Sequence, residues 1–268
     1  MRRFLEHLPE YAIEAALLGA FMVSACCFGV LLEHPDSPVH RAVGDPFLRR
    51  VLMGLAMGAT AVAIIYSPWG GRSGAHINPA TTLTFWRLGR IRGADVAGYV
   101  GAQLVGAVVG VALASALLGS RLAHTSVSFV VTRPGQWGSL VALVGEIVIS
   151  AILMAVVVML GGSRLARFTG LVVGLLVATY ITVEAPISGM SMNPARSFGS
   201  AWGAGQWDGF WIYVAGPLLG MSLGATLAAR ARPRPACPKL HHPVSQRCIF
   251  CGHAPAEQLE RSALPAAR

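Results

Sequence analysis

The sequence has almost no asparagine. Of its 268 residues, only Asn78 and Asn193 are asparagine. Each stands in a copy of the same pattern, Ser-Gly-x-x-x-Asn-Pro-Ala, at positions 73–80 and 188–195. A side chain that is otherwise avoided but kept twice in matched settings predicts a shared role, and it argues against two unrelated surface turns.

Charge is also scarce. Charged residues make up 12% of the chain, hydrophobic residues 54%, and the mean hydropathy is +0.59. Soluble domains carry about 25% charged residues, so this balance points to a membrane protein. The net charge of +9 fits basic loops on one side of a membrane. No motif combines aromatic with basic residues, so we expect no nucleic-acid partner.

Six apolar segments approach the roughly 20 residues that cross a bilayer. They are 11–32, 47–66, 94–118, 139–160, 168–185 and 209–229. Two shorter segments, 78–88 and 193–202, have about half this length and begin with Asn-Pro-Ala. The sequence therefore predicts an all-α membrane protein with six transmembrane helices and two half-helices.

The six segments fall into two similar groups, over 11–118 and 139–229. A lone acid, Glu14 or Glu146, lies in the first span of each group, and "YVGAQLVG" from Tyr99 is echoed by "YVAGPLLG" from Tyr213. Three spans per group turn the second group upside down relative to the first. The pattern predicts an inverted repeat with a site near the bilayer midplane.

The basic residues predict an orientation. With both termini in the cytoplasm, 15 of the 21 basic residues lie on the cytoplasmic side. We expect a multi-pass protein of the cell membrane, inner or plasma. Its parts are a cytoplasmic N-terminus over 1–10, a membrane domain over 11–230, and a partly disordered cytoplasmic tail rich in Cys and His over 231–268.

The Asn-Pro-Ala triplets have the chemistry of helix starts. Asparagine is a good N-cap, and proline suits the first helical position, where its missing N–H is not needed. The amide NH₂ is then left as an outward-pointing donor. Two such starts in inverted repeats meet with their positive ends together, which suits the oxygen of a neutral solute and repels cations and protons.

The motifs "SGAHINPATTLTFW" and "SGMSMNPARSF", with Glu14, Glu146, Gln103 and the Gly-Pro at 216–217, resemble the aquaporin or major intrinsic protein family over about residues 10–230. The resemblance implies a passive channel for water and small neutral solutes such as glycerol, closed to ions and protons. It also implies a homotetramer with one pore per subunit and no catalysis. The implied pore motifs are Asn78, Pro79, Ala80, Asn193, Pro194 and Ala195.

The resemblance further implies that Arg196 lines the outer constriction together with Gly58, Ile181 and Met190. A glycine and an isoleucine there should leave a wide, apolar opening, so the solute other than water stays open. Gly58 has a second interpretation, because Gly54 and Gly58 form a small-xxx-small pair that can pack two helices.

Three further residues have two interpretations each. Glu14 and Glu146 can form a proton relay, as in an ion- or proton-coupled transporter of small solutes. The resemblance implies instead that they brace the loops before the half-helices. His76, two residues before Asn78, either lines the inner pore or supports its loop.

The tail carries Cys237, His241, Cys248 and Cys251, a plausible tetrahedral zinc set. Free cytoplasmic thiols are the alternative. A metal- or redox-sensing membrane protein is thus another candidate function, while the channel itself needs no cofactor.

Overall fold

The structure is a computed structural model that describes residues 2–231, 237–243 and 248–253. Over these residues it contains helices and no strand. The helices are α1 Arg2–Glu6, α2 Leu8–Glu33, α3 Pro38–Ala42, α4 Pro46–Tyr66, α5 Pro68–Ser73, α6 Pro79–Arg87, α7 Gly93–Leu118, α8 Ser120–Ala123, α9 Gly138–Gly161, α10 Thr169–Val183, α11 Ala185–Ser188, α12 Pro194–Ala204 and α13 Ile212–Ala231. Two 3₁₀ turns, Ser128–Val130 and Ala166–Phe168, complete the set.

Six of these helical segments are long and apolar enough to cross a membrane. They are α2, α4, α7, α9, α13 and the run Ala166–Val183, which contains α10. Each overlaps a predicted span, with its ends moved by a few residues. The short helices α6 and α12 begin directly after the two asparagines. The predicted all-α membrane fold with six spans and two half-helices is confirmed.

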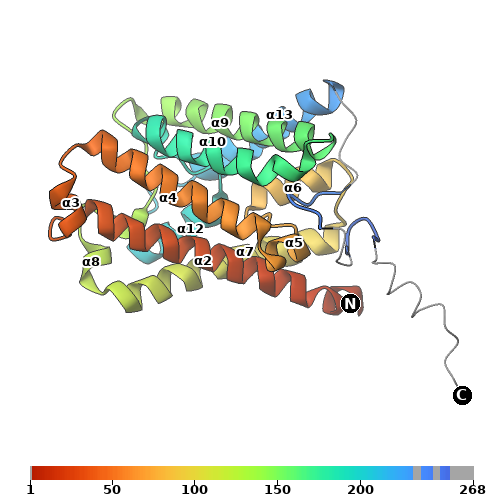
Figure 1. The fold of residues 1–268 in the computed structure, drawn as a ribbon, viewed down its shortest axis with the longest axis horizontal. Helices are drawn as coiled ribbons and strands as arrows, with labels where there is room; N and C mark the ends of the chain where they lie inside the picture. The colour runs from red at the N-terminus through yellow and green to blue at the C-terminus, as the bar shows by residue number, and fades with distance from the viewer. Residues whose placement is uncertain (1, 232–236, 244–247, 254–268) are drawn as a thin grey trace, which may run out of the picture.

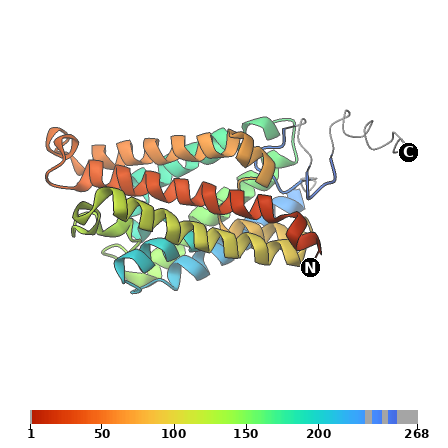
Figure 2. The same ribbon diagram turned by 90° about the horizontal axis from the view of Figure 1, so that it is seen from below.

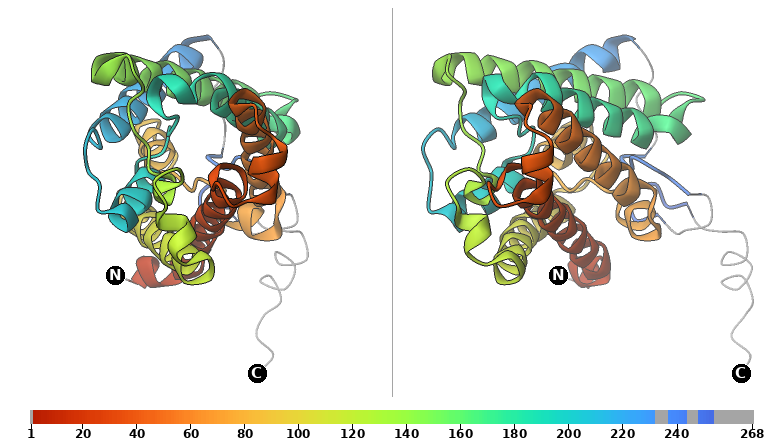
Figure 3. Two further views of the ribbon diagram at one scale, coloured as in Figure 1. Left: turned by 90° about the vertical axis from the view of Figure 1, so that its left-hand side faces the viewer. Right: turned by 60° about the vertical axis from the view of Figure 1, so that its left-hand side comes forward.

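The two repeats pack in the same way. Helix α2 lies along α7 in the first repeat, and α9 lies along α13 in the second (Figures 1 and 2). Helix α4 of the first repeat lies along α10 of the second. Seen end-on in Figure 3, the helices form a ring. The N-terminus and α5 lie at one end of the bundle, while α3 and α8 lie at the other (Figure 1).

Small residues let the helices of each pair come very close. A Cβ added at Gly106 on α7 would lie 2.2 Å from the carbonyl oxygen of Ala15 on α2. At the matching place in the second repeat, a Cβ at Gly220 would lie 2.3 Å from the carbonyl oxygen of Ile147. Helices in lipid associate through such close van der Waals contact, because lipid is as apolar as their side chains.

We expect Gly106→Val to destabilise the bundle. The valine must push α7 away from α2, and such overpacking costs about 1–3 kcal/mol or more. Gly101→Val, on the same helix, is the matched control, because nothing lies within 4 Å of a Cβ there. Thermal unfolding in detergent measures both, and equal melting temperatures for the two variants would contradict the packing described here.

The tryptophans mark two belts. All six are exposed, the least of them by 44%. Trp69 on α5 and Trp86 on α6 lie at the end of the bundle where the N-terminus lies. The other four lie at the opposite end, just before α9, near the end of α12 and just before α13: Trp137, Trp202, Trp207 and Trp211. Amphipathic indole rings gather at membrane–water interfaces, so the belts delimit the lipid-facing part of the bundle.

The two ends of the chain are more structured than the sequence suggests. Helix α1 and the start of α2 occupy the expected N-terminal segment 1–10. Tail segments 237–243 and 248–253 pack against the bundle beside α5. The rest of the predicted tail, at 232–236, 244–247 and 254–268, lies outside the described residues.

Candidate functional site: a cavity between two half-helices

Both asparagines cap their half-helices as predicted. The Oδ1 atom of Asn78 accepts a hydrogen bond from the backbone N–H of Ala80 at 2.9 Å. The Oδ1 atom of Asn193 accepts from the N–H groups of Ala195 at 3.1 Å and Arg196 at 3.2 Å. Proline follows at the first helical position in both cases. The local chemistry of the triplet therefore builds both helix starts.

The asparagine amides also join the two repeats. Nδ2 of Asn78 donates to the carbonyl oxygen of Met192, and Nδ2 of Asn193 donates to that of Ile77, both at 2.7 Å. The expectation of a wholly free amide is thus corrected, because one hydrogen of each NH₂ is used across the repeat axis. An amide nitrogen carries two hydrogens, so one remains on each side chain for a solute oxygen.

Glu14 holds the loop that leads into α6. Its Oε1 accepts from the Ser73 hydroxyl at 2.8 Å and the His76 N–H at 3.0 Å. Its Oε2 accepts from the Ile77 N–H at 2.6 Å and the Gln103 amide at 2.8 Å. The side chain is fully buried. A carboxylate with four donors acts as a brace.

Glu146 holds the loop before α12 in the same way. Its Oε1 accepts from the Ser188 hydroxyl at 3.0 Å and the Ser191 N–H at 2.6 Å, and its Oε2 accepts from the Met192 N–H at 2.8 Å. This residue is also fully buried. These bonds favour the bracing interpretation of both acids over a proton relay.

The braced loops need this support because their backbone is strained. Ala75, Ile77, Met190 and Met192 all have positive φ, between 41° and 54°. A non-glycine residue held in this region costs of order 1–3 kcal/mol. The two loops repeat the strain at matching positions, so the carboxylate bonds offset it in both.

Two buried tyrosines also hydrogen-bond to the same two loops. The hydroxyl of Tyr99 donates to the carbonyl oxygen of Ser73, and that of Tyr213 donates to the carbonyl oxygen of Ser188, both at 2.6 Å. Sequence reasoning saw the two "YV" repeats but gave these residues no role. Their nearly equal offsets from the two serines, 26 and 25 residues, were the signal that could have revealed it.

His76 supports its loop and also borders the cavity, so both interpretations contribute. Its Nδ1 lies 3.1 Å from the Thr82 hydroxyl and its ring stacks on Phe85. The residue is 2% exposed and still belongs to the cavity wall. The histidine thus connects the first loop with its half-helix.

A cavity of about 270 Å³ runs between the repeats. Its wall includes Arg50 near the start of α4, both asparagines, and Leu240 from the tail at the opposite end of the bundle. Most of the wall between them is apolar and comes from α4, α9 and α10, including Met53, Met57, Ala61, Ile65, Leu153, Met154, Val157, Val173 and Val177. The two half-helix starts therefore face a passage that extends toward both ends.

Three of the four predicted constriction residues, Ile181, Met190 and Arg196, line this cavity. Gly58 does not, because it faces α10: a Cβ added there would lie 2.5 Å from the carbonyl oxygen of Gly174. Its neighbour Met57 lines the cavity instead. The part of the cavity wall that α4 contributes is thus apolar, with Met53 and Met57 in it and Gly58 packed against α10.

Arg196 is held by the segment between α8 and α9. Its Nη1 donates to the hydroxyl of Thr132, which also bonds Ser197 at 2.8 Å. Threonine occupies the corresponding position of the first half-helix, Thr81. One fixed positive charge therefore breaks the symmetry of the two repeats.

We expect Met57→Ala to raise permeability to glycerol and urea more than permeability to water. Truncating this side chain removes atoms from the cavity wall and widens the passage. Leu55→Ala, which changes a 59% exposed side chain of the same helix, is the control. Stopped-flow light scattering compares the variants, and an unchanged solute-to-water ratio for Met57→Ala would contradict this placement.

The tail also differs from its prediction at one position. The thiol or ring-nitrogen atoms of Cys237, His242, Cys248 and Cys251 all lie within 4.8 Å of one another. His242 thus stands where His241 was expected; the His241 ring lies against Tyr66, at 4.9 Å between centroids. Adjacent histidines cannot be told apart by spacing alone. The hydrogen bond from Cys237 lowers the pKa of the Cys248 thiol.

The fold and site define a membrane protein built from inverted repeats around two facing half-helices. The chain belongs to the family of the major intrinsic proteins, whose family model matches residues 11–228. It is 40% identical over 169 residues to a probable aquaporin NIP4-2 of Arabidopsis thaliana, covering 62% of this chain and 58% of that protein. It is 36% identical over 221 residues to aquaporin NIP1-2 of Oryza sativa subsp. japonica, covering 80% and 69%.

Among solved structures, the fold is similar to that of the aquaglyceroporin from Plasmodium falciparum. The TM-score is 0.63 at 20% identity, over 84% of this chain and 94% of that one. At this identity the likeness speaks for the fold alone. The chain spans 58% of the length of the Arabidopsis relative that it matches.

Proposed function

We propose that this protein is a passive channel for water and small neutral solutes such as glycerol, and that it excludes ions and protons. One observation carries the proposal. The capped N-termini of α6 and α12 face a single cavity whose wall includes residues from both ends of the bundle. Such a passage suits a molecule that moves through without a catalytic step.

The electrostatics of the passage favour a neutral solute. Each half-helix start carries roughly half a positive charge, and Arg196 adds a full one. The remaining amide hydrogens of Asn78 and Asn193 can donate to a passing oxygen, while the surrounding wall is mostly apolar. At the two half-helix starts and at Arg196 a cation is repelled, and half-helix dipoles are a known means of excluding protons and cations. The acid in the cavity wall, Glu33, is paired with Arg49 at 3.2 Å.

A coupled carrier is the main alternative, and the buried acids speak against it. A relay needs a carboxylate that is free to bind and release a proton on the transport path. Glu14 and Glu146 are fully buried behind their loops and are used by three or four donors each. Neither belongs to the cavity wall.

Stopped-flow light scattering on reconstituted vesicles tests the proposal. The protein is purified with a chelator, which leaves the tail cysteines and histidines free of metal. We expect osmotic water permeability above that of protein-free vesicles, with a low activation energy and no response to an imposed proton gradient. Transport that follows the gradient, or that saturates at low solute concentration, would reject a channel in favour of a carrier.

We further propose a homotetramer in the cell membrane with both termini in the cytoplasm. The distribution of basic residues and the position of the N-terminus and tail at one end of the bundle support this orientation (Figure 1). Membership of the major intrinsic protein family supports the proposed tetramer. Native mass spectrometry tests the tetramer, and a fluorescent protein fused to the C-terminus tests the orientation, since it folds only on the cytoplasmic side in bacteria.

A further inference from the structure

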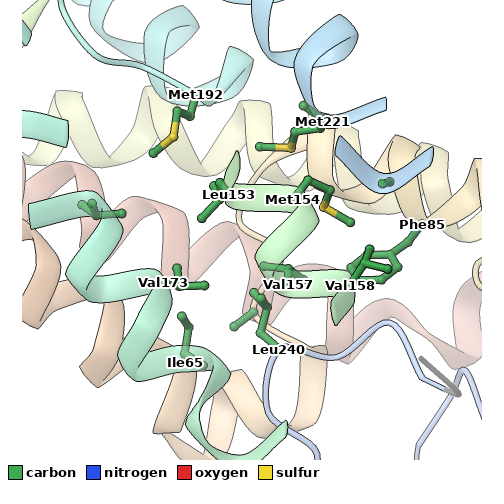
Figure 4. Close-up of a cluster of buried hydrophobic side chains, with 14 of the residues drawn as sticks. Ile65, Phe85, Leu153, Met154, Val157, Val158, Val173, Met192, Met221 and Leu240 are labelled. Atoms are coloured by element: carbon green, nitrogen blue, oxygen red, sulfur yellow. The ribbon is translucent and has the colours of Figure 1, made fainter. Parts of the chain in front are cut away.

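A tail side chain stands in one mouth of the cavity. Leu240 is 8% exposed and lies with Ile65, Val157 and Val173 in the main hydrophobic cluster (Figure 4). All four residues belong to the cavity wall. The tail therefore contributes a buried apolar plug at the end of the bundle where α5 lies.

Polar contacts fix this plug to the bundle. The backbone N–H of Leu240 donates to the carbonyl oxygen of Gly74 at 3.1 Å. Lys239, the only lysine of the chain, is 7% exposed, and its ammonium donates to the carbonyl oxygens of Gly71 at 2.9 Å and Arg72 at 2.8 Å. These carbonyls lie at the C-terminal end of α5, where a positive charge is favourable.

The tail also touches the loop that carries the first asparagine. Nε2 of His76 lies 2.9 Å from the carbonyl oxygen of Pro238. The ring of Phe250 stacks on the His76 ring at 6.0 Å between centroids and 10° between planes. Both described tail segments therefore contact the same histidine, two residues from Asn78.

The cluster of tail thiols and histidine has the geometry of a zinc site. Its sulfur pair Cys237–Cys248 is separated by 3.5 Å, and Nε2 of His242 lies 3.3 Å from the sulfur of Cys251. Tetrahedral bonds of ~2.3 Å to sulfur and ~2.0 Å to nitrogen place such ligand pairs about 3.5–3.8 Å apart. Three sulfurs and one imidazole form one of the ligand sets that structural zinc uses.

A tight turn connects Cys248 and Cys251. The N–H of Gly252 donates to the carbonyl oxygen of Cys248 at 3.1 Å. Gly252 then takes a positive φ of 73°, which turns the chain back so that the N–H of Cys248 donates to the carbonyl oxygen of His253 at 2.8 Å. This turn keeps the sulfur atoms of Cys248 and Cys251 within 4.8 Å of each other.

We propose that Cys237, His242, Cys248 and Cys251 bind one Zn²⁺, and that the metal holds the tail across the mouth of the cavity with Leu240 as the plug. The metal joins the segment that carries the plug to the segment that carries Phe250. Without it, the two segments are held only by their hydrogen bonds and packing against the bundle and are no longer joined to each other. Metal binding supplies much of the folding free energy of so small a unit. Zinc loading closes the passage and zinc loss opens it.

The metal site is tested first, on full-length protein grown with zinc and measured by elemental analysis. We expect about one zinc per chain in the wild type and almost none in Cys248→Ser or Cys251→Ser. Cys27→Ser, which changes a cysteine of α2 outside the cluster, is the matched control and should keep its zinc. A wild type without zinc, or with a Cys237–Cys248 disulfide in the mass spectrum, would overturn the proposal.

The proposal that the tail closes the passage rests on the proposed channel function. Permeability measurements test this closure separately from the metal site. In vesicles, chelation of the wild type and the substitution Cys248→Ser should each raise water permeability several-fold over the zinc-loaded protein. Leu240→Ala should raise it while retaining zinc, which separates the plug from the metal. Leu113→Ala, which changes a 55% exposed side chain of α7, is the control and should leave both the water permeability and the zinc content unchanged.

The outcomes keep the two proposals apart. If zinc-loaded wild type is permeable and neither chelation nor Leu240→Ala changes its permeability, the gate is wrong and the channel stands. If chelated wild type and Leu240→Ala both match protein-free vesicles, the channel itself is wrong and the gate falls with it. Zinc content still decides the metal site in either case.

Discussion

Replacing Glu146 with leucine is expected to abolish most water flow and to lower thermal stability. The side chain keeps a similar volume but loses its acceptors, so the N–H groups of Ser191 and Met192 are left without partners at a fully buried position. Each unsatisfied donor costs about 1–3 kcal/mol. The strained loop before α12 then relaxes and moves Asn193 away from its partner, the carbonyl oxygen of Ile77.

Stopped-flow permeability and melting temperature in detergent measure this effect. Asp208→Asn, at an exposed acid, is the matched control and should change neither. Glu146→Gln should be milder, since it retains one carbonyl oxygen. If Glu146→Leu keeps its melting temperature and loses only a proton-driven flux, the acid is a relay and not a brace.

Much of this molecule could be predicted because its determinants are local. At the start of α6 and α12, asparagine caps the helix and proline follows at the first helical position, where its missing N–H is not needed. The half-helices can therefore be predicted from a few residues of sequence. The spans follow from composition over about 20 residues. The matched acids Glu14 and Glu146 could be paired because both stand alone in apolar runs.

The prediction for Gly58 differs from the structure because the direction of a side chain around the axis of α4 decides whether that side chain faces the cavity. Met57 and Gly58 are neighbours, yet one faces the cavity and the other faces α10. Successive helical residues differ by about 100° in direction, so a one-residue change in the connection before Asn78 exchanges pore and packing positions. The spacing of Met53, Met57 and Ala61 along one face of α4 was the signal that could have decided it.

The tail was underestimated for a different reason. Its contacts join Leu240 and Phe250 to residues far away in the sequence, and no periodic pattern in the tail predicts these contacts. Likewise His241 and His242 are equivalent by spacing, and only the fold turns one toward the cysteines and the other toward Tyr66. Contacts of this kind depend on the surface that the bundle presents, which the sequence of the tail does not contain.

The remaining asymmetry of the repeats concerns charge. The capping bonds, the loop braces and the tyrosine hydrogen bonds are duplicated, but Arg196 has only Thr81 as its counterpart. The symmetric parts hold the two half-helices together and provide equal donors from both sides. The arginine is therefore the charged residue that distinguishes one half-helix start from the other, and it should govern selectivity more than stability.

Replacing Arg196 with valine is expected to preserve water flow and admit more glycerol, urea and protons. The wall residues Met57, Ile181 and Met190 offer no charged side chain, and the other charged residues of the wall are Arg50 and Glu33. We therefore expect the arginine beside the second half-helix start to be the chief electrostatic barrier at that level. Removing it widens the passage and removes a full positive charge. Solute flux should rise roughly tenfold, the effect of lowering a barrier by ~1.4 kcal/mol.

The measurement combines stopped-flow scattering in glycerol and urea gradients with a pH-sensitive dye inside the vesicles. Arg121→Val, which removes an exposed arginine of α8, is the matched control and should leave solute and proton fluxes unchanged. Because Arg196 only donates to Thr132 and carries no brace, the variant should fold and melt almost as the wild type does. A folded Arg196→Val protein with wild-type solute and proton permeability would mean that the half-helix ends and asparagines alone set selectivity, and that the constriction lies elsewhere along the cavity.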